Sequence, residues 1–591
     1  MKIRTLLIAT SAAALMITGA CKKAESGAAP ASITSDGSEW GNYMENFLKG
    51  YFPVNPAFAI YQGRHEYDGK LADFSPAGLK AMIDYRKQAV AGAQAIDEAK
   101  LSDAQEFERQ YLINTMQSEL FWLEEADQPH KNPAYYVQAL DPSVFIARPY
   151  ADAETRMKAF IKYLGNIPTA AAQIKVNLKL PLPATFVKYG QAGFGGFATS
   201  YTGDAKAAFA SVKDAALQKE YDAAAAKAAA AMQDLAAYVG SQPGTADGFA
   251  LGAEKFANMV KKTEGVDISL AQLTAIGQAD LKRNQTALAK ICARYTPGLP
   301  VQACMDKMSA NKAADGPVAE ARRQLPPIKK FLIDKNLVSI PGTEEAKVEE
   351  SPPYNRQNSA YIDIPGPFEK GLPSVYYISP PDPAWDKKTQ DEFVPGKADL
   401  LGTSIHEIWP GHFLNFLHAN RAESLFGRLF VGYAYAEGWA HYTEEMMIEA
   451  GLPDAGVMEG LTPDEIRIGQ ISNALLRDCR FISAIGLHSG TMSVEQSKQF
   501  FMKECYQSEG TAIQQSARGT YDPAYLNYTL GKLMIKQLRE DWTAKNGAGG
   551  DKTKWKAFHD EFLSYGGPQI PMVRKAMMKE AEARAVFAKT S

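Results

Sequence analysis

The chain has 591 residues, of which 46% are apolar and 22% charged, enough for a large buried core. Its 64 basic and 67 acidic residues give a formal net charge of −3, without a basic block anywhere along the chain. This balance argues against nucleic acid as a partner, because nucleic-acid-binding proteins carry a basic excess or patch.

Residues 1–20 have the pattern of a secretory signal peptide. Two cations, Lys2 and Arg4, precede an apolar run from Leu6 to Ile17 that is shorter than a membrane span. We therefore expect export, with ordinary cleavage near this point as one form of processing. No second run of about 18 apolar residues follows, so we expect the rest of the chain not to cross a membrane.

Cys21 suggests another form of processing, because small residues lead into it as in a bacterial lipoprotein cleavage site. A lipid on Cys21 would anchor the mature chain to a membrane without spanning it. The residue after the cysteine is Lys22 and not an aspartate. In this the chain resembles lipoproteins that are sent to the outer membrane, and we expect it to face the periplasm. Residues 21–39 are small and polar, as is typical of a flexible tether.

Most of the remaining chain has helical patterns, and the predicted fold is mostly α. Ser75-Pro76 predicts a helix to about residue 96, since serine caps helix starts and proline suits the first turn. Ser102 opens a second helix, whose apolar residues recur at three- and four-residue spacing. Further helices are expected over residues 152–178, 204–238, 268–295 and 318–336, and after the capping boxes at Thr462 and Ser493.

A segment rich in proline and glycine, residues 351–399, interrupts this helical pattern. Two short β-type runs, Ala360 to Ile364 and Ser374 to Ser379, predict a small antiparallel hairpin just before the His406 region. One hypothesis is that an edge strand here binds an extended peptide through main-chain hydrogen bonds. The other is that the hairpin only braces the helices.

No clean linker divides residues 40–591, so we predict one domain. Its helical N-terminal half would span about residues 40–350. The half with the β-ribbon and the metal site would span about residues 351–591.

Four cysteines follow Cys21, and none has the spacing of a zinc or redox motif. The exported compartment permits disulfides. Pairing Cys292 with Cys304 and Cys479 with Cys505 is the local choice, and free buried thiols are the alternative.

The segment from His406 to His412, HEIWPGH, is the most informative in the chain. Two histidines, an adjacent glutamate and a further glutamate about 25 residues later are the components of a zinc hydrolase site. The second histidine is six positions after the first, about 240° around an ideal helix, so a straight helix cannot present both to one ion. Pro410 and Gly411 favour an interruption. We expect a bulge or kink that turns His412 back toward His406.

The third ligand has two candidates, Glu437 and His441, which are four positions apart and share a helical face. Two histidines and one glutamate are typical of peptidase zinc. We therefore assign His406, His412 and Glu437 to one zinc ion, and His441 to the surroundings of the ligands or to the substrate. Glu407 is then free to act as the base that activates water.

Other interpretations of these residues stay open. The same polar positions would fit a helical core without a metal, although five of the eight histidines lie between residues 406 and 488. Manganese or iron are alternatives to zinc, which imidazole-rich sites usually suit. Glu444 and Glu445 are expected to be solvated charges.

With these residues, the chain resembles the bacterial DUF 885 family, relatives of gluzincin zinc peptidases such as the carboxypeptidase Taq group. The resemblance implies a helical, gluzincin-like assembly with a deep cleft and one zinc ion. It covers nearly all of residues 40–590, with a softer match at residue 55. The resembling motifs are HEIWPGHFLNF at 406, YAEGWAHYTEEM at 435, GLHSGTMSVEQ at 486 and LNYTLGKLMIKQLRE at 526, of which the HE…PGH and EGWA pair is specific.

The resemblance supports the metal ligands and the base named above and implies further roles. Tyr528 matches a tyrosine that such enzymes aim at the developing oxyanion. Arg518 matches an arginine that could pair with a substrate carboxylate or carbonyl. His488 matches a histidine whose role is either structural or catalytic. The chain departs from the pattern at residues 522–525, which replace Pro-Gly-Gln-Ala, and at Ala484, which replaces an aspartate.

We predict an exported zinc metallopeptidase that cleaves short peptides, as a carboxypeptidase, dipeptidase or oligopeptidase. One alternative is a zinc hydrolase that acts on another amide or an ester. The other is a non-catalytic lipoprotein that binds a metal or peptides, which the departures from the family pattern favour. Membrane contact is expected through the N-terminal lipid alone.

Overall fold

The computed structural model describes residue 33 and residues 35–588, apart from residues 242, 353–355, 357–358, 370, 384 and 548–549. The predicted signal peptide, the Cys21 lipidation site and most of the tether lie outside the described residues. Within them, no helix is long and apolar enough to cross a membrane.

The fold is mostly α, as predicted, with one small sheet in the described part of the chain. The helices before the sheet are α1 Glu39–Val54, α2 Pro56–Tyr61, α3 Pro76–Ala95, α4 Asp103–Leu120, α5 Gln128–Lys131, α6 Pro133–Ala139, α7 Ser143–Ala147, α8 Ala153–Asn177, α9 Ala184–Thr202, α10 Asp204–Ala208, α11 Ala215–Val239, α12 Ala253–Glu264, α13 Leu270–Tyr295, α14 Val301–Ser309 and α15 Pro317–Asp334. The helices after it are α16 Lys387–Phe393, α17 Lys397–Glu407, α18 His412–Ala419, α19 Leu425–Leu429, α20 Tyr433–Glu449, α21 Pro463–Ser489, α22 Val494–Glu504, α23 Glu509–Tyr521, α24 Asn527–Lys545, α25 Trp555–Ser564 and α26 Ile570–Met578.

Local signals start the helices where the sequence predicts. The Ser75 hydroxyl accepts from the backbone N–H of Gly78 at the start of α3, and Ser102 forms a capping box with Gln105 at the start of α4. One expected helix is wrong in extent: residues 204–238 form the two helices α10 and α11. The sequence predicts no bounds for the helices α1, α2, α5, α6, α7, α9, α12 and α14.

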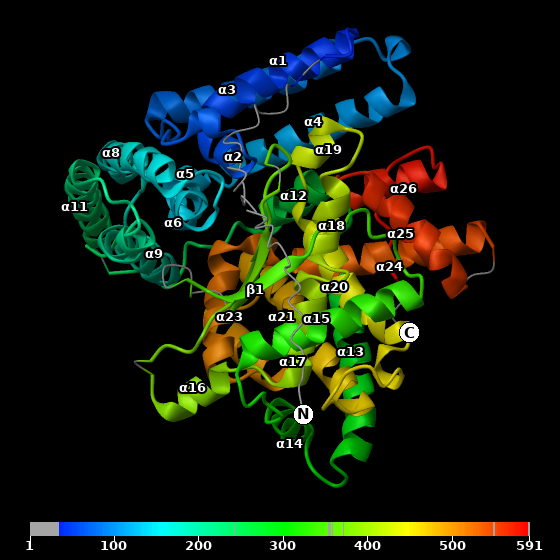
Figure 1. The fold of residues 1–591 in the computed structure, drawn as a ribbon. Coiled ribbons are helices and arrows are strands. Elements are labelled where there is room, and N and C mark those ends of the chain that lie inside the picture. The colour runs from blue at the N-terminus through cyan, green and yellow to red at the C-terminus, as the bar shows by residue number, and fades with distance from the viewer. Residues whose placement is uncertain are drawn as a thin grey trace, which may run out of the picture.

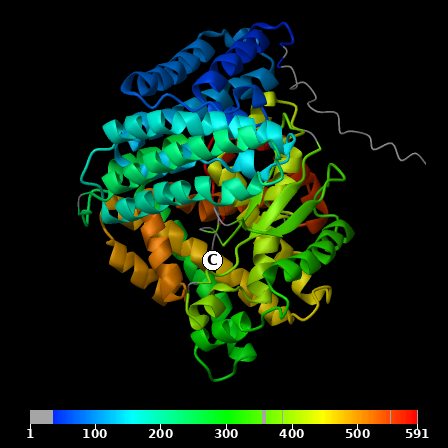
Figure 2. The same ribbon diagram turned by 60° about the vertical axis from the view of Figure 1, so that its left-hand side comes forward.

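The helices form layers around a central group (Figure 1). Helices α1, α3 and α4 lie at one end of the molecule, and α8, α9 and α11 lie side by side as a second layer (Figure 2). Around α20, α21 and α24 pack the helices α12, α13, α14, α17, α18, α22, α23, α25 and α26. Within the described chain, buried apolar side chains gather in three clusters, one in each of these regions.

The sheet contains the predicted hairpin and one strand that the sequence did not reveal. Strands β2 (Ala360–Asp363) and β3 (Ser374–Ile378) pair antiparallel, as predicted. Strand β1 (Ala346–Glu350) pairs parallel with β3, so the strand order is β1-β3-β2. The second run of the hairpin is therefore a central strand, and all five of its residues are buried.

The local pairing of the cysteines is formed. One disulfide joins Cys292 to Cys304 across α13 and α14, and the other joins Cys479 to Cys505 across α21 and the end of α22. Both bonds brace helices in the central group, and the alternative of free buried thiols is wrong.

Candidate metal centre

A break between two helices brings the two histidines of the HEIWPGH segment together. Helix α17 ends at Glu407 and α18 begins at His412, so the expected kink is a complete interruption. The Gly411 N–H donates to Ile405 O at 3.0 Å, and a Cβ at Gly411 would lie 1.7 Å from His406 O. Only glycine fits this close approach. The centres of the two imidazole rings lie 4.8 Å apart, and the ring planes are nearly perpendicular.

Glu437 on α20 completes a group of three. Its Oε2 atom lies 3.2 Å from Nε2 of His406 and 3.2 Å from Nε2 of His412. The donor atoms of these three residues all lie within 4.8 Å of one another, the one such group of histidine, cysteine or carboxylate side chains in the described chain. The structure thus brings together the three residues that the sequence assigned to the metal.

The spacing of these atoms fits a zinc ion. Two ligand atoms held about 2.0–2.1 Å from one tetrahedral zinc lie roughly 3.3 Å apart. The observed separations of 3.2 Å agree with this value. The Glu437 Oε2 atom is buried and makes no hydrogen bond of ordinary geometry. Three protein ligands would leave one position of a tetrahedral zinc ion open, as in catalytic zinc sites.

Glu407 lies beside this group, in a buried position at the end of α17. Burial raises the pKa of its carboxyl, although the nearby imidazoles of His406 and His412 oppose that shift. The buried phenol of Tyr376, from the central strand β3, lies close enough to interact with the Glu407 carboxylate. The sheet therefore packs against the carboxylate that is the candidate base.

A second carboxylate, Glu444, lies behind His406. Its Oε1 accepts a hydrogen bond from His406 Nδ1 at 2.8 Å, and it lies 3.4 Å from Arg477 Nη2. Metal-binding histidines usually donate their second ring N–H to a carboxylate, which orients the other ring nitrogen toward the ion. The expectation that Glu444 and Glu445 are solvated is wrong, because the structure buries both.

The Gly438 and Gly531 positions set how closely α20 approaches α24. A Cβ at Gly438 would lie 2.4 Å from the Gly531 Cα, and one at Gly531 would lie 2.0 Å from Ala434 O. This crossing brings Tyr528, one turn before Gly531, into the neighbourhood of Glu437. It explains the glycines of the EGWA and YTLG motifs, which let the two backbones touch.

Tyr528 and Arg518 lie in the same region. The Tyr528 ring stacks near the His406 ring, with centroids 6.2 Å apart, and burial raises the pKa of its phenol. Arg518 forms an ion pair with Asp522, with Nη2 and Oδ2 2.9 Å apart, and donates to the Tyr433 hydroxyl at 3.1 Å. The unusual residue Asp522 thus has a defined partner.

The two remaining histidines of the prediction differ in position. His441 is fully buried, with Nδ1 3.4 Å from Glu444 Oε2, so it lies behind the metal group and not on an open surface. His488 lies at the end of α21, where Nε2 donates to Gly519 O at 2.7 Å and Nδ1 accepts from Leu251 N–H at 3.3 Å. These bonds hold three segments together, which favours the structural role for His488.

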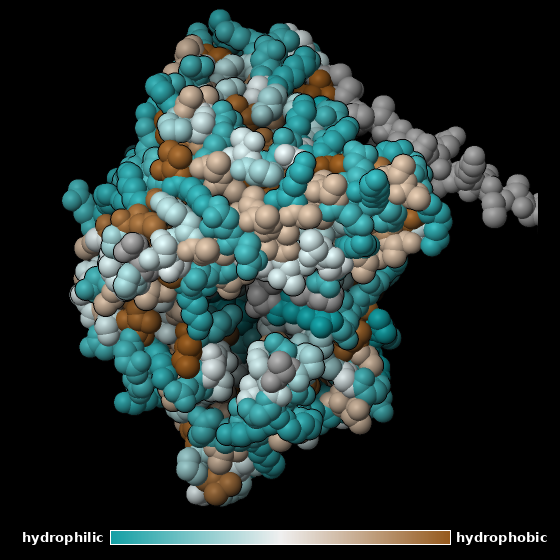
Figure 3. Space-filling view, turned by 90° about the vertical axis from the view of Figure 1, so that its left-hand side faces the viewer, coloured by the Kyte–Doolittle hydropathy of each residue, from teal (hydrophilic) through white to brown (hydrophobic). Residues whose placement is uncertain are grey.

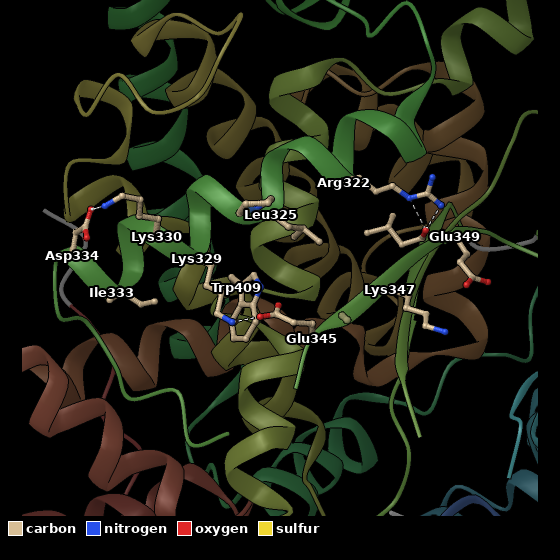
Figure 4. A pocket seen from close by; sticks show the side chains of 13 residues that line it. Arg322, Leu325, Lys329, Lys330, Ile333, Asp334, Glu345, Lys347, Glu349 and Trp409 are labelled. Carbon is tan, nitrogen blue, oxygen red and sulfur yellow. Dashed lines mark hydrogen bonds and ion pairs between the residues drawn. The ribbon is translucent and has the colours of Figure 1, made fainter. Parts of the chain in front are cut away.

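A cavity borders Trp409, away from the metal group. It encloses about 830 Å³ between α15 and β1, and Trp409 forms part of its wall (Figure 4). None of the three metal-group residues lines it. Three of its four cations are paired: Lys329 with Glu345, Lys330 with Asp334, and Arg322 with the Val348 carbonyl. The fourth, Lys347, is exposed.

The metal group itself is only partly enclosed. The side chains of His412 and Glu437 keep 12% and 20% of their surface exposed. The side of the molecule that carries α9, α16 and α23 is hollowed near its middle (Figure 3). The chemistry of the side chains therefore points to the metal group and not to the α15–β1 cavity.

The sequence missed Glu444, Tyr376 and the arginines of α21. One signal was present for Glu444. Glu437, His441 and Glu444 are spaced four and three apart, which places all three on one face of α20. Tyr376 carried no such signal, because its place beside Glu407 depends on how the sheet packs.

Comparisons with known proteins identify a family and a fold. A family model described as "Bacterial protein of unknown function (DUF885)" matches residues 56–577. A solved structure of a "putative lipoprotein of unknown function" from Shewanella oneidensis superposes with a TM-score of 0.74 at 22% identity, covering 92% of this chain and 100% of that chain. A "putative lipoprotein" from Colwellia psychrerythraea gives a TM-score of 0.75 at 17% identity, covering 92% and 99%. No curated protein matches the chain.

Proposed function

This chain belongs to the DUF885 family, and from that premise we propose that it is an exported zinc-dependent metallohydrolase that cleaves short peptides. One observation carries the proposal. Two imidazole Nε2 atoms lie 3.2 Å from the same Glu437 Oε2 atom, which is the spacing that a shared tetrahedral ion requires. The Glu444 carboxylate behind His406 supplies the outer partner that such ligands normally have.

The neighbouring residues have suitable chemistry for hydrolysis. Zinc held by this group would lower the pKa of a water molecule and polarise the peptide carbonyl. Glu407 takes a proton from that water and returns it to the leaving amine, while the water oxygen bonds to the carbonyl carbon and the C–N bond breaks. The raised pKa of Glu407 suits a group that must both accept and release a proton. Tyr528, which burial keeps protonated, donates a hydrogen bond to the developing oxyanion.

We also propose that a lipid on Cys21 anchors the enzyme to the outer membrane, facing the periplasm. The sequence around Cys21 and the description of the two similar structures as putative lipoproteins support this proposal. Labelled palmitate should enter the wild-type protein and not a Cys21→Ser variant. Equal labelling of both proteins would refute the anchor.

The metal content of the purified mature protein is the first test of the enzyme. Wild type should hold one zinc per chain, and His412→Ala and Glu437→Ala should each abolish it. A peptide pool should then be cleaved by wild type and not by Glu407→Gln, with zinc still bound to that variant. Zinc binding without cleavage would favour a binding lipoprotein or a hydrolase of another amide or ester. Absence of zinc in wild type, even after zinc is added, would refute the metallohydrolase.

A further inference from the structure

Three arginines gather around the Tyr528 ring beside the metal group. The guanidinium carbons of Arg480, Arg477 and Arg518 lie 4.8, 5.6 and 6.0 Å from the ring centroid. The first two lie on α21, and Arg518 lies on α23. This region therefore concentrates three positive charges next to the place where a substrate carbonyl would react.

Among the described residues, two of the three charges have a carboxylate partner. Arg477 lies 3.4 Å from Glu444, and Arg518 pairs with Asp522. Arg480 donates its Nε–H to the neutral Gln515 at 2.7 Å and forms no ion pair with any residue that the structure describes. The Arg480 side chain is nevertheless buried, with 7% of the residue exposed.

A buried charge without a counter-ion is unfavourable unless a ligand supplies the opposite charge. Burial and repulsion by Arg518 lower the pKa of Arg480 to about 10, which reflects the same imbalance. We propose that Arg480 binds the C-terminal carboxylate of the substrate peptide, and that the enzyme therefore cuts close to the C-terminus. This inference rests on the proposed peptidase function and names its substrate class.

The distances among His406, Tyr528 and Arg480 limit how many residues can lie between the cleaved bond and the C-terminal carboxylate. The centre of the Tyr528 ring lies 6.2 Å from the centre of the His406 ring and 4.8 Å from the Arg480 guanidinium carbon. The His406 ring centre and the Arg480 guanidinium carbon are therefore at most 11 Å apart. A carboxylate carbon sits about 4 Å from a guanidinium carbon in a two-bond pair. An extended residue spans about 3.3–3.6 Å, so one or two residues fit between the broken bond and the carboxylate.

Arg480 suits this task better than Arg518, to which the sequence assigned carboxylate binding. The Nε and Nη2 groups of Arg518 are engaged by Asp522 and by the Tyr433 hydroxyl. Neither Nη group of Arg480 donates a hydrogen bond to a described residue. Its planar fork is therefore available for a bidentate carboxylate contact.

The test measures binding separately from turnover. Zinc-loaded Glu407→Gln protein is dialysed against a pool of N-acetylated tetrapeptides with free C-terminal carboxylates, and against the same pool as C-terminal amides. Mass spectrometry quantifies the retained peptides. We expect the acids to bind about 10- to 100-fold more tightly, the range for charge-assisted hydrogen bonds. Adding Arg480→Met should abolish that preference, whereas Arg467→Met, a surface arginine on the same helix, should keep it.

Three results would each overturn the carboxylate site. They are equal binding of acids and amides, no binding of either pool, and an unchanged preference in the Arg480→Met protein. Arg480→Lys keeps the charge but not the fork, so it should retain part of the preference. This variant also decides the matter if Arg480→Met does not fold, because an unchanged preference in it would overturn the bidentate contact. An acid preference in a protein that hydrolyses no peptide would refute the peptidase and leave this site standing.

Discussion

Replacing Glu444 with glutamine removes one buried negative charge and keeps the shape of the side chain. The carboxylate accepts from His406 Nδ1 at 2.8 Å, which leaves Nε2 of that ring directed at Glu437. Its charge also makes the imidazole a stronger ligand. We expect the zinc affinity of Glu444→Gln to fall about 10- to 100-fold, the usual effect of losing an outer partner. Competition with a chromophoric chelator at neutral pH measures the change.

The same variant should be less stable, because Arg477 then keeps only neutral partners. Breaking a buried ion pair from one side costs about 3–5 kcal/mol. The separation of 3.4 Å favours the lower end, about 3 kcal/mol. Burial opposes ionisation of Glu444, but Arg477 and the neighbouring imidazoles lower its pKa below the usual 4.5. Its ionised form therefore stabilises the fold above pH 4.5, and the difference from wild type should shrink as the pH falls further.

The adjacent Glu445 provides the matched control. It is also buried, but it pairs with Arg283 at 2.8 Å and with Lys536. Glu445→Gln should therefore lose stability in urea unfolding while its zinc affinity stays within about twofold of wild type. Unchanged zinc binding by Glu444→Gln would refute the proposed role of Glu444. An equal loss in both variants would show that general destabilisation, and not the His406 contact, weakens the site.

Three further predictions concern stability. Gly531→Ala should cost about 1–3 kcal/mol in urea unfolding, because its Cβ would lie 2.0 Å from Ala434 O and push α20 from α24. Replacing Cys479 and Cys505 with serine should cost about 3.5 kcal/mol, as expected for a disulfide that closes a loop of 26 residues. Burial raises the pKa of Glu264 to about 7, so its protonated form stabilises the fold at low pH and that stability is lost as the pH rises from about 4.5 to 7. The Glu264→Gln variant should then be about 3 kcal/mol more stable than wild type at pH 8 and equal to it at pH 4.

The glycine prediction has a control variant, and each of the other two has a result that would contradict it. Gly195→Ala lies inside α9 with nothing within 4 Å of the new Cβ, so it should not destabilise the protein. A comparable loss in both glycine variants would refute the argument from helix crossing. Free thiols at Cys292, Cys304, Cys479 or Cys505 in the untreated wild-type protein would contradict the two disulfides. A pH-independent difference between Glu264→Gln and wild type would contradict the raised pKa.

Features that depend on near neighbours in the chain were predictable. The helix starts at Ser75 and Ser102 follow from side chains that cap the next turn. The interruption between His406 and His412 follows from Pro410 and Gly411, and the residue types of the metal group follow from chemistry. The fold class, the hairpin and the local disulfides could be read in the same way.

Only the tertiary structure decided the features that depend on contacts between distant segments. Strand β1 pairs in parallel with β3, but its own sequence has no alternating pattern that would mark it as a strand. Glu444 looks like a surface charge until α17 and α21 pack over it. Arg480 looks like any helical arginine, and only the packed segments reveal that no described carboxylate pairs with it. The sequence by itself determined which residues are candidates for a metal site and where helices such as α3 and α4 start, because both depend on residue type and on near neighbours. Burial and charge balance are sums over all surrounding segments, so the packed structure alone determined how those residues are supported and which neighbouring charges they have.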